Sequence, residues 1–265
     1  RDLPGMADID SSLFLFCREV KKFSVVALSG ECADEIFGGY PWFHNEKMLF
    51  ADTFPWSVSV HERTKILSPE ILNLIKPEEY IQRRYRETLS EVPHLKGENR
   101  IEARRREIFY LNINWFMATL LDRKDRMSMA SGLEVRVPFC DHRLVQYVWN
   151  IPWELKMYNK REKGLLRQAL KGILPDDIIE RKKSPYPKTH NPSYKKAVSK
   201  WLLEILNDSS SPLHQLIDVK VVRSMAEGNS DNTDPWFGQL MAQPQMLAYL
   251  IQVDFWLRDN HISIV

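Results

Sequence analysis

Residues 25–40 read VVALSGECADEIFGGY, and this stretch contains the features that decide the fold. Its first four residues belong to a short apolar run, residues 23–28. This run includes two β-branched valines and is followed by Ser29 and Gly30. Such a run is typical of a strand that is buried on both faces of a parallel sheet. Ligands of open α/β sheets bind beyond the carboxyl ends of the strands, so Ser29 and Gly30 stand where a binding site is expected.

Three carboxylates follow this run within five residues, Glu31, Asp34 and Glu35, at the start of an apparent helix that Gly38 and Gly39 end early. One interpretation is that the acids cap this helix and complement the positive charge of its N-terminus. The other is that a carboxylate and a phosphate share a bound Mg²⁺, because this cation takes oxygen ligands from one or two carboxylates and from its substrate. The spacing alone leaves both interpretations open.

Most of the remaining chain shows the apolar periodicity of amphipathic helices. We predict helices over residues 10–22, 42–51, 66–75, 77–90, 99–122, 142–150, 162–171, 193–206 and 237–257, with irregular segments at 182–192, 207–212 and 228–235. Residues 133–137 and 261–265 are weaker strand candidates, which we interpret as turn or edge structure. A single strand cannot satisfy its own backbone groups, so we expect its partners to lie upstream of Arg1.

Composition bounds the class of protein. The 265 residues are 44% hydrophobic and carry a net charge of +2, which gives no reason to expect a nucleic acid or an anionic membrane as partner. No apolar run approaches the roughly 20 residues that span a bilayer. Cys17, Cys32 and Cys140 lack metal-type spacing, and we interpret Cys140 as a small buried hydrophobic side chain. These features predict a soluble protein in a reducing compartment, the cytoplasm.

Residues 29–40, SGECADEIFGGY, closely resemble the signature SGEGxDExFGGY of asparagine synthetases, members of the ATP pyrophosphatases that adenylate a carboxylate. Only Cys32 and Ala33 depart from the commonest form, and both are small. Residues 125–141 resemble the DRxSM…ExRVPFLD block of the same family, and residues 161–186 resemble its K-x-x-L-R…LP…RxK segment. The resemblance implies an α/β, predominantly helical part of an adenine-nucleotide alpha-hydrolase-like (ATP pyrophosphatase) domain with few strands.

The resemblance also implies roles for residues of the signature. Ser29 and Gly30 would lie along the nucleotide, Asp34 would face pyrophosphate and its Mg²⁺, and Glu31 would assist the attack of ammonia on an acyl-adenylate. ATP and Mg²⁺ are thus the implied cofactors, with Asp34 as the metal ligand.

A basic segment near the end of the third block supplies the remaining role. Lys183 corresponds to the catalytic lysine of the family and would stabilise the charge that develops as pyrophosphate leaves. Lys182, one residue earlier, is the alternative. For the second block we favour structural ion pairing over ligand contacts, because ion-pair networks are the commoner use of such charges.

The implied reaction is the synthesis of asparagine from aspartate, ATP and glutamine-derived ammonia through β-aspartyl-AMP, with these small molecules as partners. The family's phosphate loop, SGGxDS, and its N-terminal glutaminase cysteine do not occur in residues 1–265. We therefore expect these residues to be the C-terminal portion of the synthetase domain and to be inactive alone. Exposed strand edges favour self-association, so a homodimer is a further expectation.

Two other functions compete with this interpretation. One is a different amide-forming synthetase that uses the same adenylate chemistry on another acid, and pyrophosphate release with a panel of acids would separate it from the first. The other is a helical interaction domain without catalysis, which an upstream sequence lacking the phosphate loop would support.

Overall fold

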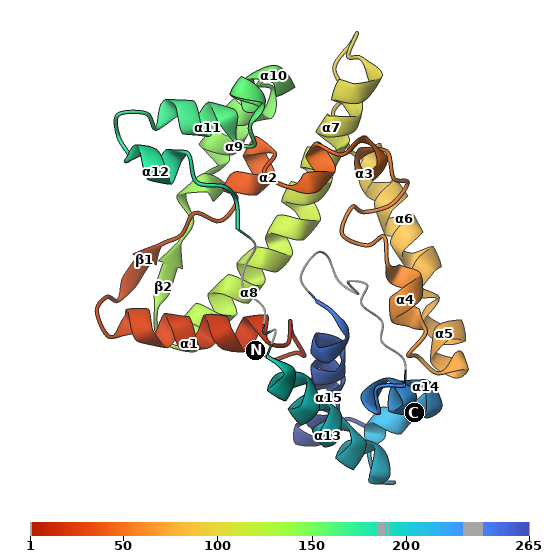
Figure 1. The fold of residues 1–265 in the computed structure, drawn as a ribbon. Helices are drawn as coiled ribbons and strands as arrows, with labels where there is room; N and C mark the ends of the chain where they lie inside the picture. Colours follow the sequence, from red (N-terminus) through yellow and green to blue (C-terminus); the bar gives the residue numbers. More distant parts are fainter. Residues whose placement is uncertain (1, 185–188, 190, 230–240, 265) are drawn as a thin grey trace. The chain divides into compact units, whose positions relative to one another are not determined.

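The strand predicted from the opening motif is present as β1 (Val26–Leu28) in a computed structural model that describes residues 2–184, 189, 191–229 and 241–264. Its partner is β2 (Glu134–Arg136), which runs parallel to β1 with Ala27 opposite Val135 (Figure 1). The expectation that the partners lie upstream of Arg1 was therefore wrong for this edge of β1, since residues 133–137 supply the neighbour there, and for the other edge it stays a prediction. Their short alternating pattern resembles an edge strand, and β2 is one.

Burial of the strand differs from the prediction as well. Val25 is 68% exposed and Leu28 is 75% exposed, so the run is not buried on both faces. In the part of the chain that the structure describes, the sheet has two strands, and each keeps one edge without a neighbouring strand. The apolar side chains of Val25 and Leu28 therefore form an exposed surface in this structure.

The chain divides into two compact units, and two of the four boundaries fall within α1 (Ile9–Lys21) and α6 (Pro77–Ser90). The first unit comprises Arg1–Leu15, Trp56–Tyr85 and Pro185–Val265, and the second comprises Phe16–Pro55 and Arg86–Ser184.

Helices packed around a leucine-rich core form the first unit. Its further elements are α4 (Val60–Thr64), α5 (Pro69–Ile75), α13 (Pro192–Asn207), η5 (Pro212–Gln215), α14 (Val219–Ala226) and α15 (Gln243–Asp259). The helices α13 and α15 lie side by side (Figure 1). Leu202 and Leu247 from these helices are 0% exposed and belong to one cluster with Val222. Of the predicted helix at 237–257, residues 237–240 lie outside the described residues.

A continuous helical column crosses the second unit. It consists of α7 (Arg100–Leu111), the π-helical turn η2 (Asn112–Met117) and α8 (Ala118–Met129), and it extends the helix predicted for residues 99–122 (Figure 1). Asn99 caps it by accepting hydrogen bonds from two backbone N–H groups, at 3.0 Å each. In the widened turn the buried Asn112 amide donates to the Ile108 carbonyl at 2.7 Å.

Shorter elements surround this column. They are α2 (Ala33–Phe37), η1 (Pro41–Phe43), α3 (Glu46–Leu49), η3 (Pro138–Cys140), α9 (His142–Trp149), α10 (Trp153–Lys156), η4 (Tyr158–Lys160), α11 (Gly164–Ala169) and α12 (Asp176–Ile179). Aromatic rings join them to the column: Phe43 lies 4.4 Å from Phe109 between ring centroids. The predicted helix at 42–51 is thus broken into η1 and α3.

A disulfide joins Cys32 of the signature to Cys140, with 5.7 Å between the two Cα atoms. The interpretation of Cys140 as a small hydrophobic side chain was therefore wrong. The sequence could not predict this pairing. The two cysteines are 108 residues apart, and they meet because η3 packs beside α2 in the fold. Cys17 stays reduced and buried.

Across the described ranges, no helix combines the length and the apolar character that a membrane crossing requires.

Candidate functional site

The opening motif forms a strand, a tight turn and a very short helix. The Ser29 N–H donates to the Arg136 carbonyl at 2.9 Å and so carries the parallel ladder one residue past β1. Cys32 then takes a left-handed conformation, φ 76°, and precedes α2. Gly38, φ 72°, ends α2 after five residues. Ser29 and Gly30 thus lie at the carboxyl end of β1, as predicted.

Asp34 at the start of α2 is held between two lysines. One carboxylate oxygen lies 2.9 Å from Nζ of Lys163, and the other lies 3.0 Å from Nζ of Lys183. Burial alone would raise the pKa of Asp34, but the two ammonium groups outweigh it and hold that pKa below its ordinary value. Asp34 is therefore a carboxylate that stays ionised in a largely buried position.

Lys183 is fixed by more than this ion pair. Its ammonium donates to the Gly39 carbonyl at 3.1 Å and lies 3.9 Å from the centroid of the Tyr40 ring. Lys182, which the sequence left as an alternative, has no hydrogen bond or ion pair with a described residue. Lys183, and not Lys182, therefore contacts Asp34 and the turn after α2.

The two glycines after α2 are required by close packing. A side chain at Gly39 would collide with the carboxylate of Asp34, and a Cβ at Gly38 would lie 2.5 Å from the ring of Trp153. Gly38 also has a positive φ, which L side chains rarely adopt. The Gly-Gly pair thus lets the backbone pass directly beneath Asp34.

The three acids predicted as a cluster have separate partners. Glu35 is 1% exposed and accepts a hydrogen bond from the Tyr40 hydroxyl. Burial raises the pKa of Glu35, and burial together with Glu35 raises the pKa of Tyr40. Glu35 therefore faces the interior and braces the turn, whereas Asp34 faces the lysines.

Glu31 has a different environment again. One carboxylate oxygen accepts from the Ser29 hydroxyl at 3.4 Å, and the other lies 3.5 Å from Nζ of Lys124 on α8. Cys17 is near both charges: burial raises the pKa of its thiol, Lys124 opposes that rise, and Glu31 adds to it. Glu31 is thus a carboxylate with one half-buried cationic neighbour.

The cavity beside Asp34 has a volume of about 340 Å³, which lies within the range of small-ligand pockets. Its basic lining residues are Lys163, Arg167, Arg181, Lys182 and Lys183, with Asp34 as the acid among its described lining residues. Such an excess of positive charge favours a polyanion.

Arg167 is committed to structure within this lining. Its guanidinium donates to the Glu162 carboxylate at 3.0 Å and to the Arg181 carbonyl at 3.1 Å. It therefore holds the segment that leads from α12 to Lys183.

The donor set fits a triphosphate with Mg²⁺. The described residues contain no group of three or more His, Cys, Asp or Glu that could hold a metal ion by themselves. Mg²⁺ needs one or two carboxylates when phosphate oxygens complete its shell, so Asp34 suffices.

The structure brings together some of the predicted site residues. Asp34, Lys182 and Lys183 line one cavity, while Ser29, Gly30 and Glu31 lie outside its lining. Two contacts were missed from sequence, Lys163 with Asp34 and Lys124 with Glu31. Lys163 begins the K-x-x-L-R pattern, which could have identified it, whereas nothing local indicated that Lys124 approaches Glu31.

Comparison with known proteins agrees with the motif. A family model described as asparagine synthase matches residues 1–258. The chain is 58% identical over 266 residues to asparagine synthetase [glutamine-hydrolyzing] 3 of Bacillus subtilis (strain 168), covering 100% of this chain and 43% of that protein. It is 30% identical to asparagine synthetase [glutamine-hydrolyzing] 1 of the same organism, over 83% of this chain and 40% of that protein.

A human relative is more distant. The asparagine synthetase [glutamine-hydrolyzing] of Homo sapiens is 28% identical over 66% of this chain and 22% of its own length. The chain therefore spans less than half the length of the curated relatives it matches.

Proposed function

The chain belongs to the asparagine synthase family, and we propose that residues 1–265 form the C-terminal, ATP-binding part of the synthetase domain of a glutamine-hydrolysing asparagine synthetase. The observation that carries this proposal is Asp34 held between Lys163 and Lys183 at the edge of a cationic cavity. We further propose that the domain has the ATP pyrophosphatase fold, with β1 and β2 as two strands of its parallel sheet.

In this proposal the two lysines bind the β- and γ-phosphates of ATP. Each ammonium already faces a negatively charged oxygen of Asp34, so the lysines are positioned before the nucleotide arrives. Pre-positioned cations stabilise a developing negative charge without reorganising during the reaction. Lys183 is thus suited to the charge that accumulates as pyrophosphate leaves.

Asp34 would share its carboxylate with Mg²⁺ once the phosphates draw the lysines towards themselves. Bound Mg²⁺ would neutralise charge on the phosphate oxygens of the leaving group. Because the pKa of Asp34 is held low, the carboxylate needs no deprotonation before it binds the cation.

The reaction that we propose begins with attack of the aspartate β-carboxylate on the α-phosphate of ATP, which gives β-aspartyl-AMP and pyrophosphate. Ammonia from glutamine then displaces AMP. Glu31 would position the ammonia and accept its proton, while Ser29 and Gly30 lie along the nucleotide. Lys124, whose Nζ lies 3.5 Å from the Glu31 carboxylate, would hold that carboxylate in position for this role.

The remaining proposals concern the setting of the enzyme. We propose that other segments of the protein supply the phosphate loop and the glutaminase, and that residues 1–265 are inactive without them. We place the enzyme in the cytoplasm, with aspartate and glutamine or ammonia as substrates and no nucleic-acid partner. The exposed edge of β1 is available for self-association as a homodimer.

Pyrophosphate release by the intact protein tests the assignment of Lys183. We expect Lys183→Met to lower the aspartate-dependent rate by about 10²- to 10³-fold, as loss of one preorganised donor does. Lys182→Met changes the same segment without removing a contact to Asp34, so we expect a much smaller loss. A larger loss in Lys182→Met than in Lys183→Met would contradict the assignment.

A further inference from the structure

A second cavity, separate from the one beside Asp34, contains a buried lysine without an anionic partner. Lys156 ends α10 and is 2% exposed. Its Nζ lies 3.9 Å from the centroid of the Phe109 ring. No carboxylate of a described residue lies within ion-pairing distance of it. Buried ammonium groups are rare unless paired, because desolvation of the charge is costly.

The cavity that Lys156 lines has a volume of about 310 Å³ and lies wholly within the second unit. Its aromatic lining residues are Phe109, Trp149 and Trp153. It shares no lining residue with the cavity beside Asp34. Trp153 packs against Gly38 on its other side, so this wall is fixed by the turn that follows α2.

Arg105 is the second cation of this cavity without an anionic partner. Its guanidinium carbon lies 4.5 Å from the centroid of the Trp153 ring. Its Nε is buried and has no hydrogen-bond partner among the described residues. Two cations without an ion-pair partner among the described residues, Lys156 and Arg105, therefore line one small aromatic cavity, and Glu154 and Glu102 act on Arg105 only at longer range.

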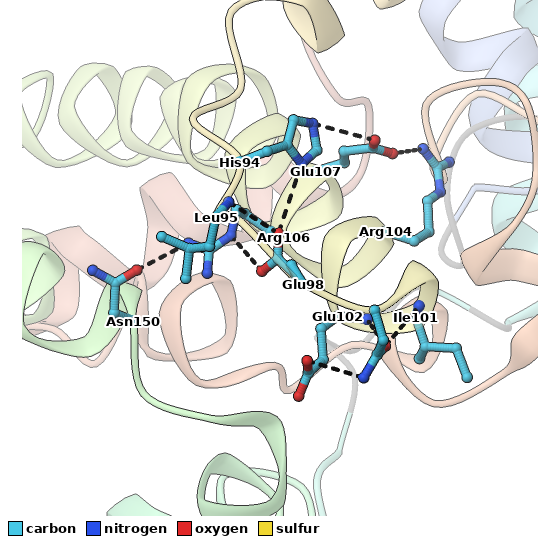
Figure 2. Close-up of polar contacts among 10 residues, drawn as sticks. His94, Leu95, Glu98, Ile101, Glu102, Arg104, Arg106, Glu107 and Asn150 are labelled. Carbon is cyan, nitrogen blue, oxygen red and sulfur yellow. Dashed lines mark hydrogen bonds and ion pairs between the residues drawn. The ribbon is translucent and has the colours of Figure 1, made fainter.

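The other charges at the cavity are already satisfied. Arg106 donates to the Glu98 carboxylate at 2.7 Å and to the Asn150 side chain at 3.0 Å (Figure 2). Glu102 accepts from the Asn99 amide at 3.0 Å, beside the start of α7. Arg106 thus has an ion-pair partner, whereas Lys156 and Arg105 have none among the described residues.

We propose that this cavity is a binding site for a small organic monocarboxylate, whose carboxylate contacts Lys156 and Arg105 and whose flat apolar body packs against Trp149 and Trp153. The aromatic lining favours an apolar body over a bare inorganic ion. Glu98 and Glu102 also line the cavity, and their charges would repel a dianionic phosphate. The volume is at the small end of ligand pockets, which suits a small organic acid.

Protonation of Lys156 gives the site a measurable signature. Burial, and then the charge of Arg106, lower the pKa of Lys156 to about 7. A bound carboxylate favours the charged amine, so binding should take up a proton when the pH is above 7. The other ionisable groups facing the cavity are Lys96, Glu98, Glu102, Arg105 and Arg106 from the segment entering α7 and from α7 itself, with Glu154 on α10 near Arg105.

The test uses the intact protein and 4-fluorobenzoate as probe, with ¹⁹F NMR as the readout of binding. We expect saturable binding that weakens as the pH rises from 7 to 9, by up to about tenfold per pH unit. The neutral, isosteric 4-fluorobenzamide should not bind, and inorganic phosphate should not compete. Titration calorimetry in two buffers of different ionisation enthalpy should show proton uptake at pH 8.

Two variants connect this binding to the cavity. Lys156→Met keeps an unbranched apolar side chain and should weaken 4-fluorobenzoate binding by about 10- to 100-fold while removing its pH dependence. Lys160→Met, on an exposed residue that does not line the cavity, should leave the affinity unchanged. Absence of binding to the wild-type protein, equal binding of the benzamide, or an unaltered affinity in Lys156→Met would overturn the proposal. If Lys156→Met does not fold, the wild-type protein still tests the proposal. Binding that does not weaken between pH 7 and 9, or binding without proton uptake at pH 8, would overturn it.

Discussion

The ammonium of Lys183 lies 3.0 Å from the carboxylate of Asp34, although 149 residues of sequence separate a signature acid from a basic loop. The same ammonium donates to the carbonyl of Gly39. A single lysine thus joins the start of α2, the turn that ends it and the segment after α12. This relationship explains why the signature and the basic loop act as one site in the proposed enzyme.

Substitution of Gly39 should disturb this relationship directly. In Gly39→Ala the added methyl group collides with the Asp34 carboxylate, so we expect Asp34 to move away from Lys183. Aspartate-dependent pyrophosphate release by the intact protein should then fall as far as in Lys183→Met. Circular dichroism and urea unfolding of Gly39→Ala show whether the variant folds, so that a loss of activity can be assigned to the contact with Asp34. Full activity of Gly39→Ala would show that the contact with Asp34 is dispensable.

The stability of the protein should depend on Asp34 in a defined pH range. The pKa of Asp34 is lower in the folded state than its ordinary value, so its ion pairs stabilise the fold fully above about pH 4, where the unfolded carboxyl is also ionised. That stabilisation is lost as the pH falls through the folded pKa. Urea unfolding should therefore show a larger deficit for Asp34→Asn at pH 7 than at pH 3. A deficit that grows on acidification would contradict the ion-pair account.

Glu31 and Lys124 should affect amide formation more than adenylation. We expect Glu31→Gln to keep aspartate-dependent pyrophosphate release but to lower asparagine formation by about 10²-fold or more, as loss of a general base does. Lys124→Met should produce a smaller loss of the same kind, and Lys124→Arg should restore part of it. Lys22→Met changes a surface lysine whose side chain is 60% exposed, and it serves as the control. Wild-type asparagine formation in Glu31→Gln would remove Glu31 from the mechanism.

The Cys32–Cys140 disulfide should contribute to stability through the loop of 108 residues that it closes. Chain-entropy arguments give about 4 to 5 kcal/mol for a loop of this length, so reduction should lower the free energy of unfolding by up to that amount. Guanidinium unfolding with and without a reductant measures the difference. Equal unfolding midpoints in the two conditions would show that the disulfide does not stabilise the fold.

The left-handed backbone conformation of Cys32 should affect the stability of variants at this position. Under reducing conditions Cys32→Gly should be more stable than Cys32→Ala by about 1 kcal/mol, because glycine adopts a positive φ without steric cost. Neither variant can form the disulfide, so the comparison isolates the conformational effect. The opposite order would mean that packing around Cys32 outweighs its backbone strain.

Local sequence patterns predicted most helices well. The range 77–90 coincides with α6 (Pro77–Ser90), and 193–206 differs by one residue at each end from α13 (Pro192–Asn207). These helices have a regular apolar stripe and a proline or asparagine at the N-terminus, which are signals within a few residues of one another. The helix predicted for 42–51 failed because prolyl and aromatic residues near its start form η1 instead.

Contacts between distant segments could not be predicted in the same way. The parallel pairing of β1 with β2, the Cys32–Cys140 disulfide and the approach of Lys124 to Glu31 each join residues more than 90 positions apart. The hydrophobic periodicity and the turn residues are local signals, and they do not predict such pairs. Only the family resemblance predicted that Asp34 and Lys183 belong to one site. The contact of Lys163 with Asp34 became known from the structure.

The most direct test of the proposed function is the fate of ¹⁸O from the carboxylate of labelled aspartate during turnover of the intact protein with ATP and glutamine. Formation of β-aspartyl-AMP through the site at Asp34 and Lys183 predicts one labelled oxygen in AMP for each asparagine formed, with pyrophosphate unlabelled. Label in inorganic phosphate, with ADP in place of AMP, would contradict the account.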